Sequence, residues 1–409
     1  MNGGPLQGVR ILELSYFLAG PAATSLMAQL GAEVIKVESI QRPDPWRMFQ
    51  SLPVAPPDIR YGSSAYDLAN TDKLCVGINI SKPKGAEVAR RLAAKVDIVS
   101  ENFTPGVVDR LGLGYEDIRK VKPDIIYVSS SSCGNTGPLR DYVGYAPIFA
   151  SMSGASHCTG YEDGPPSFFL GGVDQWSAYV ATFGMMAALI HHQSTGEGQF
   201  IQHASVEAIA LYFGDQYLDY ILNNRIANRK GNRHGSCAPH NCYRCAGEDK
   251  WVTIAVMNER EWLSLCRVME KPELANDSRF STSTDRWTNQ KELDAIITEW
   301  TKDKDYYEAT EILQGAGVAA APSLDPEGLF KDPHVKQRGM FVQIDHPATV
   351  GINEKKDWVF APPWRLSETP GSVKRHAPIL CEHTDRIFEE IVGMPKKEIQ
   401  SLREEGILS

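Results

Sequence analysis

The sequence lacks the features that would place the protein in a membrane, on a nucleic acid or on a dinucleotide. Its longest apolar stretch, QWSAYVATFGMMAALI (175–190), ends at two histidines and is too short and too interrupted to span a bilayer. The formal net charge of -9 argues against general nucleic-acid binding, because phosphate backbones attract basic surfaces. Neither a G-x-G-x-x-G nor a G-x-x-x-x-G-K-[ST] motif is present. Any substrate or cofactor must therefore be held in another way.

Cysteine is also sparse and scattered, which argues against a disulfide framework. The eight cysteines are spread over 409 residues, as is typical of reduced thiols, and no basic and then apolar segment opens the chain. We therefore expect a cytoplasmic protein. The one dense group is His234, Cys237, His240, Cys242 and Cys245, but its spacing does not match the ligand pairs of a zinc site. We predict no metal, and the role of this cluster stays open.

What is present indicates an α/β protein with two domains. Over the first 150 residues short apolar runs alternate with helical patterns, which predicts βαβ units around a parallel sheet. The chain then divides into a large α/β domain (1–224), a linker with a smaller α+β domain (225–332) and a C-terminal segment (333–409) that returns to the large domain. Strands are predicted at 9–17, 33–39, 74–80, 96–102 and 124–132, and helices at 21–32, 85–95, 175–190 and 203–224, with 194–200 as a turn.

Asp174 is the main candidate for chemistry. It follows a glycine-rich stretch, FFLGGVD (168–174), and directly precedes the predicted helix 175–190. On an exposed turn at the positive end of a helix, the ionised and nucleophilic form of a carboxylate is favoured. The residues alone also allow a plain helix N-cap, which is the commonest role of Asp before a helix. His191 and His192, in the last turn of the same helix, are expected only to complement the helix dipole.

Several segments in the same order resemble the family III CoA-transferases. They are VRILELSYFLAGPAATSLMAQLGAEVIKVE (9–38), SENFTPGVVDRLGLGYEDI (100–118), GNTGP (134–138), GPPSFFLGGVDQ (164–175), TGEGQFIQHASVEA (195–208), DPHVKQRGMF (332–341) and APILCEHTDRIFEEIVG (377–393). The resemblance implies a Rossmann-like large domain, a smaller domain and an interlocked dimer, formed by one chain or with a homologous subunit. It also implies transfer of CoA from an acyl-CoA, with succinyl-CoA as one candidate donor, to a carboxylic acid.

The resemblance assigns roles to individual residues. Asp174 matches the family's nucleophile, which forms aspartyl anhydride and aspartyl-CoA intermediates, so no cofactor beyond the CoA substrates is expected. Gly171 and Gly172 would allow close approach and supply oxyanion donors. The CoA site is expected to include Leu18, Ile78, Asn102, Phe103, Arg110 and Tyr145.

Some positions depart from the family's pattern. Leu18 stands where the oxalate enzyme has Gln, which argues against a small acid such as oxalate. Ala146 stands where the family has an acidic residue, and Ala178 and Cys381 each stand where it has a Gly. We expect Ala178 to crowd the turn after the nucleophile. The acceptor is therefore open, with a larger apolar or aryl acid such as a benzylsuccinate as one hypothesis.

Two other functions are weighed. An α-methylacyl-CoA racemase of similar fold would need a His at the place of Tyr145, and the tyrosine hydroxyl is a poor base at neutral pH. A weakly active subunit of a heteromeric CoA-transferase is the other alternative, and the retained Asp174 argues against it.

Overall fold

The computed structural model describes residues 3–49, 59–167, 172–345 and 356–408. It separates into two compact units. The larger unit comprises Met1–Ser156, Phe168–Ile226 and Lys336–Ser409, and the smaller comprises His157–Ser167 and Ala227–Val335. Residues 157–167 thus belong with the smaller unit, although they precede the Asp174 helix in the sequence.

The larger unit is built on a six-stranded parallel sheet in the order β3-β2-β1-β4-β5-β6. Almost every residue in the first five strands is buried, which fits apolar runs covered on both faces. The predicted parallel α/β fold is confirmed. The strands are β1 Arg10–Glu13, β2 Glu33–Glu38, β3 Leu74–Gly77, β4 Ile98–Glu101, β5 Ile126–Ser131 and β6 Gln199–Ala204.

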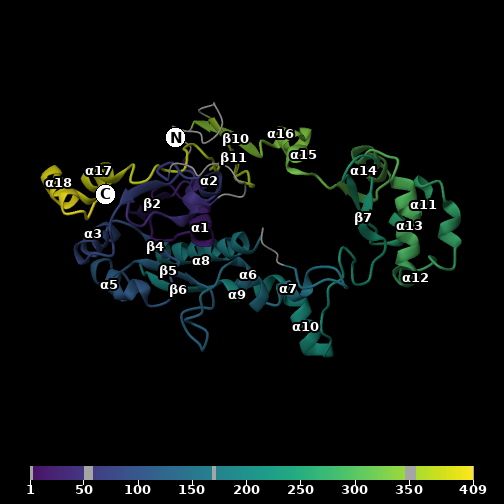
Figure 1. The fold of residues 1–409 in the computed structure, drawn as a ribbon, viewed down its shortest axis with the longest axis horizontal. Coiled ribbons are helices and arrows are strands. Elements are labelled where there is room, and N and C mark those ends of the chain that lie inside the picture. The colour runs from purple at the N-terminus through teal and green to yellow at the C-terminus, as the bar shows by residue number, and fades with distance from the viewer. Residues whose placement is uncertain (1–2, 50–58, 168–171, 346–355, 409) are drawn as a thin grey trace. The chain divides into compact units, whose positions relative to one another are not determined.

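Helices cover both faces of this sheet (Figure 1). Because side chains alternate along a strand, Ile11 packs under α1 and α8 on one face, whereas Leu12 packs with α3, α5 and the C-terminal helices on the other. The helices of this unit are α1 Ala19–Gln29, η1 Pro45–Met48, α2 Ser64–Asn70, α3 Pro83–Ala93, α4 Val107–Arg110, α5 Tyr115–Val121, α6 Ala146–Met152, α8 Val173–Thr195, α9 Ser205–Tyr212, α10 Gly214–Asn223, α17 Thr384–Ile387, the π-helical turn η3 Phe388–Val392 and α18 Lys396–Glu404.

The C-terminal segment is part of the larger unit. The backbone N–H of His383 donates to the carbonyl of Cys75 at 2.9 Å, and the Asp72 carboxylate accepts from the backbone N–H groups of Lys374 and Arg375. A two-stranded antiparallel sheet, β10 Phe341–Asp345 and β11 Lys356–Phe360, precedes it. Cys381 has a φ of 61°, a left-handed conformation that suits the Gly found in the family better than it suits cysteine.

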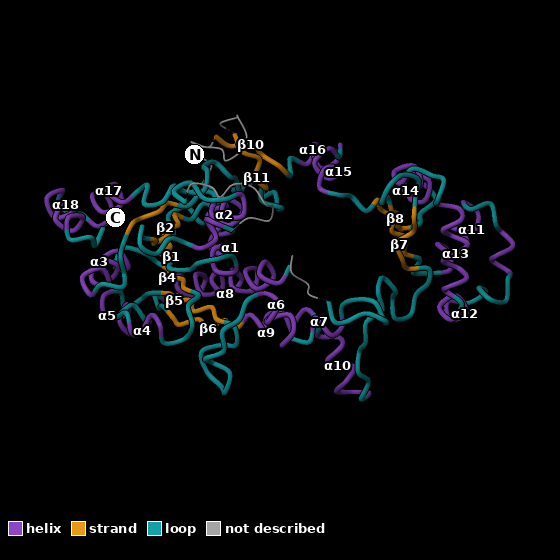
Figure 2. The backbone as a smooth tube through the Cα atoms, viewed as in Figure 1, coloured by secondary structure: helices purple, strands orange, loops and turns teal. Residues whose placement is uncertain are grey.

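The smaller unit packs helices on a three-stranded antiparallel sheet in the order β7-β8-β9 (Figure 2). Its core is centred on Trp262, Leu265 and Phe280. Among the described residues no group of three or more potential ligands, including the Cys237–Cys245 cluster, could hold a metal ion. The elements are β7 His240–Arg244, β8 Trp251–Ala255, α11 Glu259–Val268, η2 Pro272–Asn276, α12 Ser283–Thr288, α13 Gln290–Thr301, α14 Tyr306–Gly315, β9 Ala319–Pro322 and α15 Pro326–Lys331; α7 Ala155–Cys158 and α16 Pro333–Arg338 cross the unit boundaries.

One part of the sequence prediction is wrong. The predicted turn at 194–200 ends in the edge strand β6, which covers residues 199–204. The helix expected at 203–224 is two helices, which begin at Ser205 and Gly214. The preceding TGEG resembles a hairpin turn, and only pairing with β5 in the folded chain identifies QFIQHA as a strand.

Candidate active site

The strand order places a natural ligand site beside β1. In the order β3-β2-β1-β4-β5-β6 the chain winds in one direction from β1 and in the other from β4. In open α/β sheets ligands bind outside the carboxyl ends of the two strands at such a reversal. Residues 14–18 follow β1 and residues 102–103 follow β4, so the segments that carry Leu18, Asn102 and Phe103 meet there.

Asn102 holds the loop after β1 in place. Its side-chain oxygen accepts from the backbone N–H of Tyr16 at 2.9 Å, and its amide nitrogen donates to the Tyr16 carbonyl at 2.8 Å. The ring of Phe103 lies edge-on to Tyr16, with centroids 5.7 Å apart. A Cβ on Gly20 would meet Asn102 and Ser15, so the loop and the Asn102 amide fit closely. The amide of Asn102 therefore shapes the site, whatever it contacts in addition.

Phe17 links this loop to the start of helix α6. It has a φ of 65°, which is a strained conformation for a bulky residue. Its N–H donates to the Asp44 carboxylate at 3.0 Å. Its ring meets Tyr145, the residue before α6, edge to face at 5.6 Å, and also lies 6.4 Å from Trp46. Tyr145 is half-exposed, so this aromatic group faces solvent in part.

Asp174 lies at the same edge of the sheet. Helix α8 leads into β6, which runs parallel to β5, so α8 begins at the carboxyl edge of the sheet, as α1 does after β1. The two helices pack together, and the Thr182 hydroxyl donates to the carbonyl of Ala23. At 1.5 Å per residue, Asp174 stands roughly 12 Å from that contact, toward the edge that carries the switch point.

The local geometry of Asp174 differs from the sequence prediction. Gly172 is the residue before α8, and Asp174 is the second helical residue, partly buried rather than on an exposed turn. Asp174 is not the N-cap, since Gly172 occupies that position. Burial raises the pKa of Asp174 to about 6, whereas the helix terminus was expected to favour ionisation. A carboxylate with this pKa is still mostly ionised at pH 7 and is more basic than usual.

The other residues predicted for the site differ in how far they are exposed to a ligand. Leu18 is half-buried immediately before α1. Arg110 is exposed at the end of α4, and its guanidinium has no hydrogen-bond or ion-pair partner among the described residues. Ile78 is 1% exposed in the core and its N–H donates to the carbonyl of Glu38, so the structure does not present it to a ligand as predicted. Gly171 lies outside the described residues. Ala178 is buried inside α8 against α1, so it does not crowd a turn as expected.

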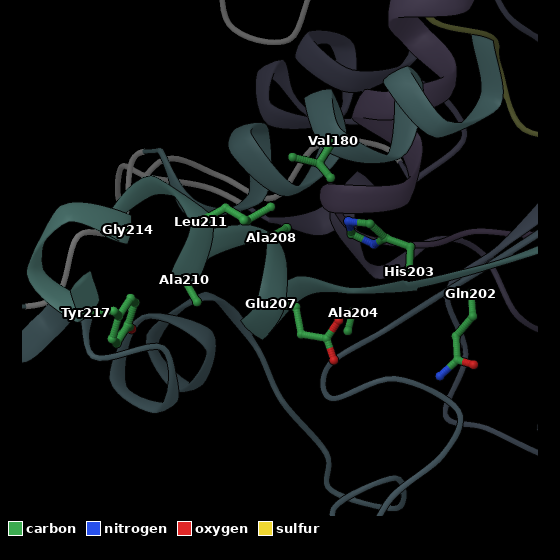
Figure 3. Close-up of a pocket in the computed structure, with 10 residues that line it drawn as sticks. All are labelled: Val180, Gln202, His203, Ala204, Glu207, Ala208, Ala210, Leu211, Gly214 and Tyr217. Carbon is green, nitrogen blue, oxygen red and sulfur yellow. The ribbon is translucent and has the colours of Figure 1, made fainter. Parts of the chain in front are cut away.

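A cavity of about 470 Å³ lies further along α8 (Figure 3). It is lined by Val180 of α8, by residues of β6 and α9, and by Gly214 and Tyr217. His203 lies beneath it with Nδ1 2.9 Å from the Ser130 hydroxyl, and burial lowers its pKa to about 4, so the imidazole is neutral. None of the predicted site residues lines this cavity.

Sequence reasoning missed the charges under the loop after β1. The side chains of Glu13, Lys36, Glu38, Asp44, Arg47 and Lys73 form ion pairs and are at most 1% exposed. The signal was present, because strand segments such as RILE and EVIKVE carry charges among buried apolar residues. Because a buried charge requires a partner of opposite charge, each charged residue in a buried strand indicates that another lies close to it in the fold.

Comparison with known proteins identifies the family. The model of CoA-transferase family III matches residues 6–384. The chain belongs to CoA-transferase family III. The predicted resemblance is confirmed, and the protein is a CoA-transferase enzyme.

Related proteins of this family match over their length. Human succinyl-CoA:glutarate CoA-transferase is 33% identical, over 100% of this chain and 90% of that protein. Succinyl-CoA–D-citramalate CoA-transferase of Chloroflexus aurantiacus is 32% identical over 99% of this chain and 98% of the relative. A crystal structure of a CaiB/BaiF family protein from Brucella suis superposes with a TM-score of 0.84 at 29% identity, covering 95% of this chain and 100% of that one. No helix in the described ranges has the length and apolar character needed to cross a bilayer.

Proposed function

We propose that this CoA-transferase moves CoA from succinyl-CoA to an aliphatic dicarboxylic acid through covalent intermediates on Asp174. The observation that carries the proposal is the position of Asp174, a partly buried carboxylate in the first turn of α8 at the sheet edge that holds the β1–β4 switch point. Its raised pKa keeps it both ionised and basic at neutral pH, which suits a nucleophile.

The first half of the reaction loads CoA onto the enzyme. The Asp174 carboxylate attacks the thioester carbonyl of the donor, the C–S bond breaks, and a mixed anhydride and CoA thiolate form. The thiolate then attacks the Asp174 carbonyl of the anhydride, and the donor leaves as its free carboxylate. Each tetrahedral intermediate carries an oxyanion, for which the free N–H groups at the start of α8, next to Gly172, are suitable donors.

The second half repeats these steps in reverse order. The acceptor carboxylate attacks the aspartyl-CoA thioester and releases CoA thiolate, and the thiolate attacks the acceptor's carbonyl in the new anhydride. Asp174 is regenerated and no proton is consumed. The chemistry requires no metal or organic cofactor, since the nucleophile and the leaving group come from Asp174 and the substrates.

The neighbouring residues fit roles in holding CoA and the acyl group. Arg110 is an exposed guanidinium without a described partner, which suits a phosphate of CoA. Phe103, Leu18 and Tyr145 offer apolar surface at the switch point for the pantetheine arm or the acyl chain. Asn102 acts through the backbone of Tyr16, and the buried Ile78 contributes to the core beneath the site.

The choice of substrates rests on the relatives. Proteins similar to this chain are named for succinyl-CoA with glutarate, D-citramalate or L-malate. These names favour a dicarboxylic acceptor over the aryl acid considered from sequence. The aromatic group of Phe17, Trp46 and Tyr145 is a structural feature that favours an aryl acid.

A substrate panel tests the proposal. With succinyl-CoA as donor, we expect glutarate and four- or five-carbon hydroxy- or methyl-dicarboxylates to yield their CoA thioesters, measured by liquid chromatography and mass spectrometry. Monocarboxylates of equal length serve as matched controls, and benzylsuccinate and phenyllactate represent the aryl alternative. Exclusive use of an aryl acid would overturn the acceptor assignment, and absence of any transfer from succinyl-CoA would overturn the donor.

We also propose that a second copy of the chain, or a homologous subunit, covers helix α10. None of its residues is buried, although Leu218, Ile221 and Leu222 are 57%, 72% and 76% exposed. Apolar side chains gathered on one element are typical of an interface. In analytical ultracentrifugation we expect a dimer for the wild type and a monomer for the double variant Leu218→Glu/Leu222→Glu. Leu68→Glu on α2, at a position that is 47% exposed, is the control and should stay dimeric; an unchanged mass for the double variant would reject this surface.

A further inference from the structure

The loop after β1 is held by a buried group of charges that the proposed chemistry does not use. Lys36 Nζ donates to the carbonyl of Ser15 at 2.7 Å and lies 2.9 Å from the Asp44 carboxylate. Glu13 lies 3.6 Å from Lys36 and accepts from Lys73 at 2.8 Å. All four side chains are at most 1% exposed. Burying four charges is costly, so the arrangement calls for a reason beyond stability.

Four backbone groups in this loop are hydrogen-bonded to side chains of distant residues. Lys36 donates to the carbonyl of Ser15, and the Asn102 amide bonds both the N–H and the carbonyl of Tyr16. The Asp44 carboxylate accepts from the N–H of Phe17. The residue so fixed, Phe17, is the one with the strained φ of 65°. A conformation of this kind persists only when its surroundings over-determine it, and such strain gathers at functional sites.

Asp44 connects the loop to a second element of the site. The same oxygen that accepts from Phe17 N–H also accepts from the N–H of Trp46 at 2.9 Å and caps the short helix η1. Asp44 is itself fixed, since its own N–H donates to Glu38 at 2.8 Å. One carboxylate therefore sets the positions of the Phe17 and Trp46 rings, and through Phe17 the contact with Tyr145.

We propose that Asp44, held by Lys36, is a positioning residue for CoA transfer: it locks Phe17 in its left-handed turn and so presents the apolar wall against which the acyl group lies beside Asp174. This inference rests on the proposed function of the Asp174 site. Asp44 touches no substrate and acts only through Phe17 and Trp46. Misplacing such a wall by about 1 Å is enough to slow a reaction on the order of 10²-fold.

Kinetics of Asp44→Ala test the proposal. We expect kcat to fall about 10- to 100-fold, with a much smaller change in the KM for the CoA donor. Asp72→Ala is the matched control. Asp72 is also buried and also accepts backbone N–H groups, but it fixes the C-terminal segment at Lys374 and Arg375. It should lower the melting temperature similarly and leave kcat within about twofold. Equal kcat losses in the two variants, or no loss in Asp44→Ala, would overturn the proposal.

A double-mutant cycle at Phe17 and Asp44 tests the same turn by thermal unfolding and does not require an activity measurement. Gly adopts a positive φ without strain, so Phe17→Gly should be more stable than Phe17→Ala while Asp44 holds the turn, and this difference should shrink in the Asp44→Ala background, where the turn can relax. The two substitutions at 17 differ in backbone freedom but remove the same ring. If the difference in melting temperature between Gly and Ala at position 17 is the same with and without Asp44, then Asp44 does not fix the turn. A wild type that unfolds as expected but transfers no CoA would reject the proposed function instead and leave this coupling measurable.

Discussion

Replacing Asp174 with Asn is expected to abolish CoA transfer while making the protein more stable. The amide has almost the same shape as the carboxylate but is not a nucleophile, so kcat should fall by at least about 10³-fold. Intact-protein and peptide mass spectrometry after succinyl-CoA and hydroxylamine should give a hydroxamate at position 174 in the wild type and none in the variant. Asp117→Asn is the control, because Asp117 occupies the first turn of α5. Retained turnover in Asp174→Asn would exclude the covalent mechanism.

The stability gain follows from the burial of Asp174. Its pKa is raised from 3.8 to about 6 in the folded protein, so the folded state holds the proton more tightly than the unfolded state. Above pH 6 the charged carboxylate therefore opposes folding, and this penalty disappears as the pH falls through 6 toward 4. The shift corresponds to about 1 to 3 kcal/mol at neutral pH, which a neutral Asn would recover. Denaturant titrations at pH 7.5 and 4.5 should show the variant's advantage only at the higher pH.

Protonation of Asp174 also determines the pH below which the reaction slows. Only the ionised carboxylate attacks the thioester, so kcat/KM should fall about tenfold per pH unit below a midpoint near 6. An ordinary exposed aspartate would place that midpoint near 4. The position of the limb thus reports directly on the burial of Asp174.

The sequence was sufficient to predict the parts of the fold that depend on local patterns. β1 to β5 each contain a short apolar run and are separated by helical segments, and parallel order follows from the crossovers. β6 was missed because it lies at the edge of the sheet, where alternate residues are exposed and a Gly-rich turn precedes it. Its assignment depends on pairing with β5, 68 or more residues earlier in the chain, which no local pattern contains.

The site was predicted in position but not in electrostatics. Asp174 was found from its place before a helix and from the family resemblance, yet the direction of its pKa shift was wrong. The dipole of α8 is a local property, whereas the burial that dominates comes from packing between distant elements. Asn102 was expected at the CoA site, but its two hydrogen bonds to Tyr16 appear only when β1 and β4 are neighbours.

Replacing Arg47 with Met is expected to be the most destabilising single change in the buried charge group. The guanidinium donates to both oxygens of Glu38, at 2.8 and 2.7 Å, and to the Tyr66 hydroxyl at 2.6 Å. Its carbon lies 4.0 Å from the centre of the Tyr66 ring. Both charged side chains are fully buried, so removal of Arg47 leaves Glu38 as an uncompensated charge and should cost about 3–5 kcal/mol in unfolding free energy.

The pKa of Glu38 shows that Arg47 outweighs the cost of burial. Burial alone would raise this pKa, but the charge and hydrogen bonds of Arg47 hold it at about 2, below its ordinary 4.5. Because the folded-state pKa is depressed, this stabilisation is complete above pH 4.5 and is lost as the pH falls toward 2. The double variant Glu38→Gln/Arg47→Met should therefore be more stable than the sum of the two single changes indicates, measured by urea unfolding at pH 7.

The control is Arg10→Met, which breaks an ion pair with Glu33 that is one-third exposed and should cost about 1 kcal/mol or less. A loss of that small size in Arg47→Met would mean that Glu38 finds another partner or takes up a proton, and that the group does not depend on Arg47.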